Sequence, residues 1–238
     1  MNKKAFIALL IAILLPISGY LLVSYYSSNA VQMPKRFFYD SVNVVKDNGK
    51  ISYDTAWHHV ENLHFTNQLG QQVSLNDLKG KILVIDFFFT HCPSLCPKLA
   101  VAMKKLQNSF PNSGDSIVQF VSLSIDPEHD SVAQLRNWAQ KFNINPDSWW
   151  LGTGNRDSIY KFALTELKAS VADSNIDTAF IHSDKFFLLD KNRVVRGWFD
   201  GLDSVAQSNL VRDIPLLMLE KDKKKTFGDF FKGLLKSG

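Results

Sequence analysis

The sequence predicts an α/β domain with a central mixed sheet flanked by helices, preceded by an apolar N-terminal helix. Short apolar runs alternate with segments of helical periodicity from residue 61 to residue 220, and such alternation produces parallel strands covered by helices. The run at 81–89 is almost continuously apolar, which is typical of a strand covered on both faces. The uncharged stretch at 5–26 predicts the N-terminal helix, because about 20 apolar residues suffice to cross a bilayer.

The elements of the domain can be placed one by one. Residues 63–66 and 72–75 flank a Gln-Leu-Gly turn and predict a short hairpin. After the strand at 81–89, apolar side chains recur in steps of four, four, three and four and predict one face of a helix: Leu95, Leu99, Met103, Leu106 and Phe110. The later elements are a strand at 117–125, a helix at 132–142 capped by Ser131, a strand at 149–151, a helix through 159–163, strands at 185–189 and 194–199, and a last helix from Asp203 or Ser204 that Pro215 should kink or split.

Four parts are expected along the chain: a membrane anchor at 1–26, an extracytoplasmic stalk at 27–60, the folded domain at 61–220 and a basic tail at 221–238. Lys3 and Lys4 precede the anchor and no positive charge follows it until Lys35, so the domain should face the extracytoplasmic (periplasmic) side. A cleaved signal peptide is the alternative, because residues 28–30 fit a cleavage site. The apolar run is long for a signal peptide, and we therefore expect an anchor that is retained.

The charge of the chain is close to balanced. Lys and Arg number 27 against 23 Asp and Glu, and much of the excess lies at the two ends. Nucleic-acid binding is therefore not expected, because no basic stripe runs through the domain.

In the tail, Phe and Leu side chains recur at helical spacing among lysines. This segment could lie on an anionic membrane surface or pack on the domain as a terminal helix.

The only two cysteines of the chain, Cys92 and Cys96, lie where a predicted strand gives way to a predicted helix. Ligands gather at the carboxyl ends of the strands in open α/β sheets, so this pair marks a site. Pro93 suits the first position of a helix, which would place both sulfurs about one turn apart on one face. The helix N-terminus should favour both thiolates. Such a pair could chelate one soft metal ion or close a disulfide.

A histidine is the natural third ligand to seek, because thiolates and imidazole suit Cu(I), although zinc takes the same ligands. The chain has six histidines: His58, His59, His64, His91, His129 and His182. His58 and His59 lie in or near the expected stalk. His182 ends a long polar loop directly before a strand, and in this topology the loop could reach the end of the sheet that holds Cys92.

Three motifs occur in order along the chain: THCPSLCP at 90–97, DPEHD at 126–130 and the pair His182-Ser183. With Gly-Thr-Gly at 152–154, they resemble the Sco/SenC family of copper-binding proteins, which act in assembly of the binuclear copper centre of cytochrome c oxidase. The resemblance covers about residues 62–214. It implies a thioredoxin-like fold and an N-terminal membrane anchor. The implied partners are the copper-bearing subunit of cytochrome c oxidase and an upstream donor of copper or electrons.

The resemblance also implies roles for single residues. Cys92, Cys96 and His182 would bind copper, as Cu(I), Cu(II) or both. Asp126 and Asp130 would support the geometry of a loop near the site rather than bind the metal.

Three departures from the family pattern bear on affinity and redox tuning rather than on the ligand set. Ile181 stands where the family often has an acidic residue before the ligand histidine. Ser131-Val132 replaces the usual Thr-Pro after the DPxxD motif. His91 stands where a small polar residue is common, and could be an extra ligand, a proton donor or a bystander. We take it as a bystander, because ring direction rather than sequence adjacency decides ligation.

Two functions from different classes fit these residues. The first is a copper metallochaperone that passes copper to the oxidase subunit by ligand exchange. The second is a membrane-anchored thiol–disulfide oxidoreductase acting on cysteines of an oxidase subunit, with Cys92 and Cys96 as its catalytic pair. We expect the metallochaperone, because a purely redox protein would have no need of His182. Peroxide reduction is a third function, disfavoured by Cys96-Pro97 and by the lack of a matching activating arginine nearby.

Overall fold

The computed structural model describes residues 3–30, 32–47, 50–110, 117–169 and 183–220. The chain divides into two compact units, Met1–Met33 and Pro34–Gly238. The first unit contains the expected N-terminal helix, α1 (Lys3–Ala30). Within the described ranges, no helix meets the length and apolar character required of a membrane-crossing helix.

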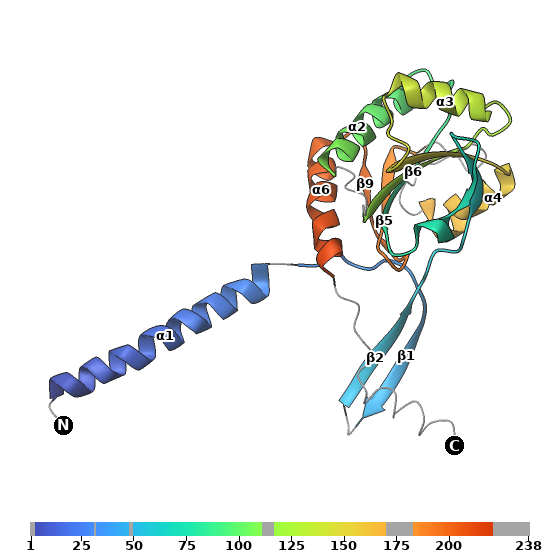
Figure 1. Cartoon of the computed structure of the whole chain (residues 1–238). Coiled ribbons are helices and arrows are strands. Elements are labelled where there is room, and N and C mark those ends of the chain that lie inside the picture. Colours follow the sequence, from blue (N-terminus) through green and yellow to red (C-terminus); the bar gives the residue numbers. More distant parts are fainter. Residues whose placement is uncertain (1–2, 31, 48–49, 111–116, 170–182, 221–238) are drawn as a thin grey trace. The chain divides into compact units, whose positions relative to one another are not determined.

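The second unit is built on a mixed sheet of seven strands, in the order β4-β3-β7-β6-β5-β8-β9 (Figure 1). Three parallel neighbours form its centre: β5 (Ile82–Phe88), β6 (Val118–Ser124) and β7 (Trp149–Thr153). Antiparallel strands complete it on both sides: β3 (His64–Asn67), β4 (Gln72–Ser74), β8 (Lys185–Leu189) and β9 (Val195–Asp200). The predicted α/β class with a mixed central sheet is thus confirmed. Every residue of β5 and β6 is buried, as expected for strands covered on both faces.

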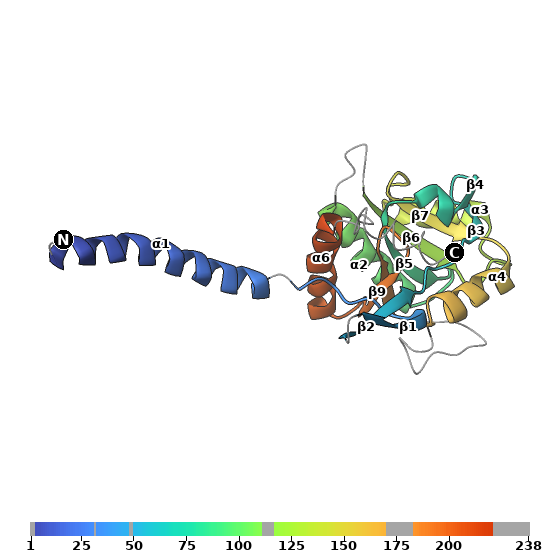
Figure 2. The ribbon, with the colours of Figure 1, turned by 90° about the horizontal axis from the view of Figure 1, so that it is seen from below.

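Helices cover the sheet. They are α2 (Leu95–Ser109), α3 (Val132–Lys141), α4 (Arg156–Lys161), which continues into a π-helical turn η2 (Phe162–Glu166), and α6 (Ser204–Leu219); a short 3-10 helix η1 (Leu75–Leu78) follows β4. Helices α2 and α6 lie side by side in both views, and the strands separate α2 and α3 from α4 (Figures 1 and 2). These elements match the predicted order of strands and helices.

The ends of two helices show why they begin where they do. Ser131 Oγ accepts a hydrogen bond from the Gln134 N–H at 3.4 Å and so caps α3, as predicted. The Asp203 carboxylate caps α6 by accepting from two backbone N–H groups of its first turn, at 3.3 and 2.9 Å. Of the two expected effects of Pro215, a kink or a split, the split is wrong, since α6 continues to Leu219. Its buried side chains Leu210, Ile214 and Leu217 keep the helix packed on both sides of the proline.

A two-stranded hairpin lies within the segment that was expected to be a polar stalk. Strands β1 (Tyr39–Asp47) and β2 (Lys50–Trp57) pair antiparallel, with Val44 opposite Tyr53. The sequence contains a signal for it, because Asn48-Gly49 between two extended runs is a strong short-range hairpin pattern. The prediction missed the hairpin because its side chains are largely exposed and show no sustained apolar alternation.

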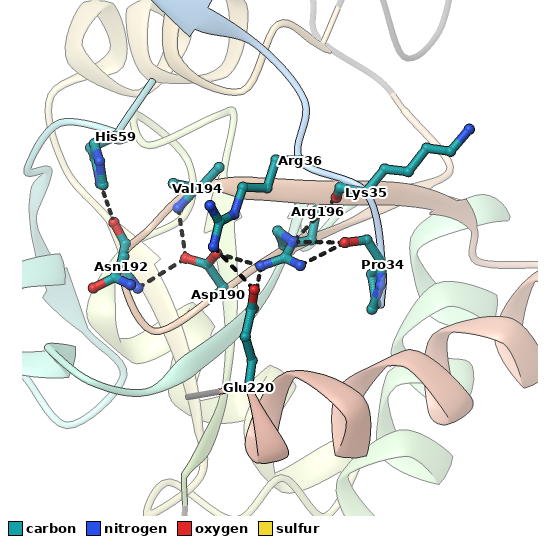
Figure 3. A network of polar contacts seen from close by, with 9 residues as sticks. All are labelled: Pro34, Lys35, Arg36, His59, Asp190, Asn192, Val194, Arg196 and Glu220. Carbon is teal, nitrogen blue, oxygen red and sulfur yellow. Dashed lines mark hydrogen bonds and ion pairs between the residues drawn. The ribbon is translucent and has the colours of Figure 1, made fainter. Parts of the chain in front are cut away.

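A buried arginine joins the beginning of the second unit to Glu220, the residue that follows α6 (Figure 3). The Arg196 side chain, 1% exposed, donates to Asp190 Oδ2 at 2.8 Å, to the Pro34 carbonyl at 2.6 Å and to Glu220. Asp190 also accepts from two backbone N–H groups of its own loop. We call Pro34, Asp190, Arg196 and Glu220 the arginine clasp. It holds the first residue of the unit and the end of α6 against the loop between β8 and β9.

Candidate metal centre

A buried carboxylate fixes the backbone that leads into the thiol pair. Asp130 is fully buried and accepts from Thr90 N at 3.2 and 3.1 Å, from Thr90 Oγ1 at 2.5 Å and from Ser124 Oγ at 2.5 Å. Ser124 ends β6, and Thr90 lies two residues after the end of β5 and two before Cys92. We call Thr90, Ser124 and Asp130 the Asp130 network. It has the loop-supporting role that the sequence resemblance implied for Asp130.

The two cysteines meet at the first turn of α2. Cys92 lies in the turn between β5 and α2, and Cys96 is the second residue of the helix. Both are buried, with 6% and 2% exposure, and the structure has them as thiols rather than a disulfide. The backbone N–H of Cys96 donates to the Cys92 sulfur at 3.2 Å. The helix begins at Leu95 instead of near Pro93 because the chain stays non-helical through Ser94, where φ is −142°.

Burial changes the acidity that was expected of this pair. Desolvation raises the pKa of the Cys96 thiol well above its ordinary value, and the hydrogen bond with Cys92 raises it further. The expectation that the helix N-terminus would favour the thiolate form is therefore wrong for Cys96. The stabilisation that the partial positive charge of a helix N-terminus gives to an anion is smaller than the free-energy cost of burying that anion in these apolar surroundings.

A second buried acid lies close to the thiols and was missed by sequence reasoning. Asp86 is in the middle of β5, opposite Ser122 of β6, and only 3% exposed. Burial raises its pKa to about 7, and its Oδ1 atom has no hydrogen-bond partner among the described residues. The negative charge of Asp86 is one of the causes of the raised pKa of Cys96, so the two side chains interact electrostatically. A charged residue inside the apolar run at 81–89 was the available signal.

At the surface beside the thiols, two histidines share one carboxylate. His129 Nδ1 lies 2.9 Å from both oxygens of Asp126, and His91 Nε2 lies 3.3 Å from Asp126 Oδ2. The centroids of the two imidazole rings are 5.5 Å apart, and the rings of His91 and Phe89 form a T-shaped pair with their centroids 4.8 Å apart. The hydrogen bond to Asp126 raises the pKa of His129. The DPEHD motif therefore contacts the thiol loop through both of its aspartates.

The predicted ligand His182 lies outside the described residues, but its neighbour Ser183 is described. Ser183 is 2% exposed and immediately precedes β8. Strand β8 runs antiparallel to β5, with Phe187 opposite Ile85, so β8 begins at the end of the sheet where β5 stops and the thiol loop starts. Across the described part of the chain, no three His, Cys, Asp or Glu side chains are grouped so as to hold one metal ion.

The fold and the site together define a class of protein: a thioredoxin-like domain with two neighbouring cysteines at the junction of a central strand and the following helix. The family model described as SCO1/SenC matches residues 53–218. The chain is also 32% identical over 162 residues to the "SCO1 protein homolog" of Bacillus subtilis (strain 168), covering 68% of this chain and 83% of that protein. The chain therefore belongs to the SCO1/SenC family.

Two solved structures extend the comparison. One is BsSco, a member of the Sco family of cytochrome c oxidase assembly proteins in which a disulfide switch was identified. It is 30% identical, covers 70% of this chain and 98% of its own, and has a TM-score of 0.57. The other is ScoI of Bradyrhizobium japonicum with copper bound, 24% identical with a TM-score of 0.51, covering 65% of this chain and 98% of its own. The second likeness is one of fold.

Proposed function

We propose that the protein is a copper metallochaperone that binds copper through Cys92, Cys96 and His182 and delivers it to the binuclear copper centre of cytochrome c oxidase during assembly. The observation that carries the proposal is the meeting of Cys92 and Cys96 at the first turn of α2, where the Cys96 N–H contacts the Cys92 sulfur. Family membership supports the same function, because BsSco is described as a member of a family of oxidase assembly proteins.

The chemistry of the thiols suits a soft cation. Thiolate, not thiol, is the metal ligand, so each sulfur gives up its proton when copper binds. The proton on Cys96 is held tightly because an anion there would be poorly solvated. Copper replaces that proton with another positive charge and so removes the penalty of a buried anion. Two thiolates and one imidazole make a three-coordinate Cu(I) site with an open side, where ligands of the acceptor subunit can attack.

The position of Ser183 supports His182 as the third ligand. Ser183 is buried at the start of β8, and β8 starts at the end of the sheet where the thiol loop begins. A residue that precedes Ser183 is therefore attached to the correct end of the sheet for the site. His58 and His59 do not offer this: His58 pairs with Asp40 and Glu166, and His59 contacts the Asn192 carbonyl in the loop at the far end of β8.

The delivery role includes an anchor in the same membrane as the acceptor. The uncharged stretch at 5–26 within α1, preceded by Lys3 and Lys4, supports α1 as that anchor, with the second unit on the extracytoplasmic side. The partners in this account are an upstream donor of copper or electrons and the copper-bearing oxidase subunit.

The test is an anaerobic Cu(I) titration of the reduced protein against a chromophoric competitor. The variants are Cys92→Ala, Cys96→Ala and His182→Ala, with His64→Ala as the matched control because His64 is exposed and contacts Asn62. Tight binding of one copper per chain, lost in the three variants and kept in the control, is the expected result. Binding indifferent to all three substitutions would refute the proposal.

A specific observation keeps the thiol–disulfide oxidoreductase as the second candidate. The Cys92 sulfur contacts the backbone of Cys96, so little movement separates the dithiol from a disulfide. In the same titration, weak copper binding that ignores His182, together with a readily reduced Cys92–Cys96 disulfide, would favour this candidate.

A further inference from the structure

The surface next to the thiol loop carries two imidazoles that the proposed ligand set does not use. His91 and His129 come from different loops, the one after β5 and the one after β6, yet their rings lie 5.5 Å apart. Both rings line one surface pocket of about 550 Å³, which also includes Thr90 of the Asp130 network. Their side chains are 55% and 71% exposed, whereas Cys92 and Cys96 are buried.

One carboxylate, that of Asp126, contacts both imidazole rings. Asp126 lies against Nε2 of His91 and Nδ1 of His129. A neutral imidazole has one N–H and one lone pair, so a ring that donates its N–H to Asp126 presents the lone pair on its other nitrogen, Nδ1 of His91 and Nε2 of His129. Histidines that bind metals almost always donate their second nitrogen to a carboxylate or carbonyl in this way.

The exposed location of His91 and His129 would let them meet an arriving metal ion before the buried cysteines do. A copper ion arriving from a donor protein meets exposed groups before buried ones, and His91 directly precedes the buried Cys92 in the chain. Imidazole is a good ligand for copper but a weaker one for Cu(I) than thiolate, so a two-imidazole station binds the ion and still lets the thiols take it. The negative charge of Asp126 beside the rings favours a cation there.

We propose that His91 and His129, oriented by Asp126, form a transient copper station that receives the ion from the donor and passes it to the thiols. The proposal rests on the proposed function in that copper is the cargo. Each transfer step is a ligand exchange without change of oxidation state. A copper–imidazole bond breaks as a copper–sulfur bond forms, and the displaced thiol proton goes to solvent.

The first test isolates the station from the thiols. In the full chain with Cys92→Ser, Cys96→Ser and His182→Ala, a Cu(I) titration should reveal a residual weak site. Adding His91→Gln or His129→Gln should weaken that site by at least about tenfold, whereas adding His64→Gln should leave it unchanged. A residual site that ignores both substitutions, or no residual site at all, would overturn the station.

The second test uses chains with their thiols intact, so it does not depend on the folding of the multiple variant. Stopped-flow absorption of the copper–thiolate bonds follows arrival of Cu(I) from a small-molecule copper complex. The His91→Gln/His129→Gln chain should fill its thiols roughly tenfold more slowly than His64→Gln does, and reach the same final occupancy. An equal rate would refute the station while leaving the metallochaperone intact. A failure of the unsubstituted chain to bind copper at all would refute both.

Discussion

A buried carboxylate lies near each end of strand β5, and different partners hold the two carboxylates in place. At the carboxyl end, Asp130 accepts hydrogen bonds from uncharged groups of Thr90 and Ser124. At the amino end, where Leu83 pairs with Leu189, the next residue Asp190 binds the guanidinium of Arg196. Asp130 is therefore held by hydrogen bonds from uncharged groups, whereas Asp190 combines such hydrogen bonds with an ion pair.

The two carboxylates therefore have different roles: Asp130 shapes the candidate site, and Asp190 helps to hold the unit together. The Asp130 network joins two strand ends and sets the path of the backbone into Cys92, so its bonds act on the shape of the proposed copper site. The arginine clasp joins Pro34 and Glu220, which lie 162 and 24 positions from Arg196 in the sequence. It acts on the stability of the whole unit. Changes at the first end should alter copper binding, and changes at the second should alter unfolding.

The largest effect on stability should come from the clasp. Arg196→Met removes the guanidinium and leaves the buried Asp190 without its cation, while Glu220 keeps only its ion pair with Arg36; the loss should lower the free energy of unfolding by about 3–5 kcal/mol. Urea unfolding followed by tryptophan fluorescence measures the loss. Arg36→Met is the matched control, because Arg36 is 39% exposed and its ion pair with Glu220 should contribute under about 1 kcal/mol. Equal effects of the two substitutions would remove the clasp from this account.

Asp86 sharpens the comparison because it is a buried carboxylate without a full set of partners. Its pKa of about 7 in the folded chain lies above the ordinary value of 3.8, so the folded state prefers the proton. The stability that this proton brings is present below pH 3.8 and is lost as the pH rises through 7. Asp86→Asn carries no such charge and should raise the free energy of unfolding at pH 8 by up to roughly 4 kcal/mol, with little effect at pH 4. A gain that does not change between pH 4 and pH 8 would contradict the raised pKa.

The Asp130 network should give a smaller loss of stability but a clear effect on copper. Asp130→Asn keeps the shape of the side chain and removes the charged acceptor, at a cost of about 2 kcal/mol and about tenfold in copper affinity. Asp77→Asn is the control, since Asp77 accepts from Ser74 N at 2.6 Å beside the outermost strand β4. Competitor titrations of both variants decide the matter. Loss of copper affinity in Asp77→Asn as well would mean that general destabilisation explains the effect.

The smallest expected effect concerns the N-terminal cap of helix α6. Asp203 caps the first turn of α6, and Glu220 at its other end belongs to the arginine clasp. Asp203→Ala should cost about 1 kcal/mol in urea unfolding and leave copper affinity unchanged. A loss well above that value would show that the cap also holds the end of β9 in place.

Much of the fold could be predicted because the signals are local. The apolar run at 81–89 and the helical spacing from Leu95 correspond to β5 and α2 in the structure. The β1–β2 hairpin was missed because exposed strands lack the apolar alternation on which such predictions depend. The partners of Arg196 could not be foreseen either, because residues that meet only through the fold leave no local pattern.

The site was predictable in identity but not in acidity. Cys92 and Cys96 are close together as expected, since four positions at a helix start suffice to bring them there. The raised pKa of Cys96 depends on the burial of its side chain and on the nearby charge of Asp86 in β5. The spacing of residues along the chain reveals neither of these. The pairing of His91 with His129 likewise depends on how two loops meet at the edge of the sheet.

The most direct test of the central claim is X-ray absorption spectroscopy at the copper edge of the Cu(I)-loaded full-length protein. The account predicts a first shell of two sulfur atoms and one nitrogen atom, with the nitrogen lost in His182→Ala and the sulfurs lost in Cys92→Ser/Cys96→Ser. A shell made of nitrogen and oxygen in the unsubstituted protein, or one that survives both sets of substitutions, would contradict it.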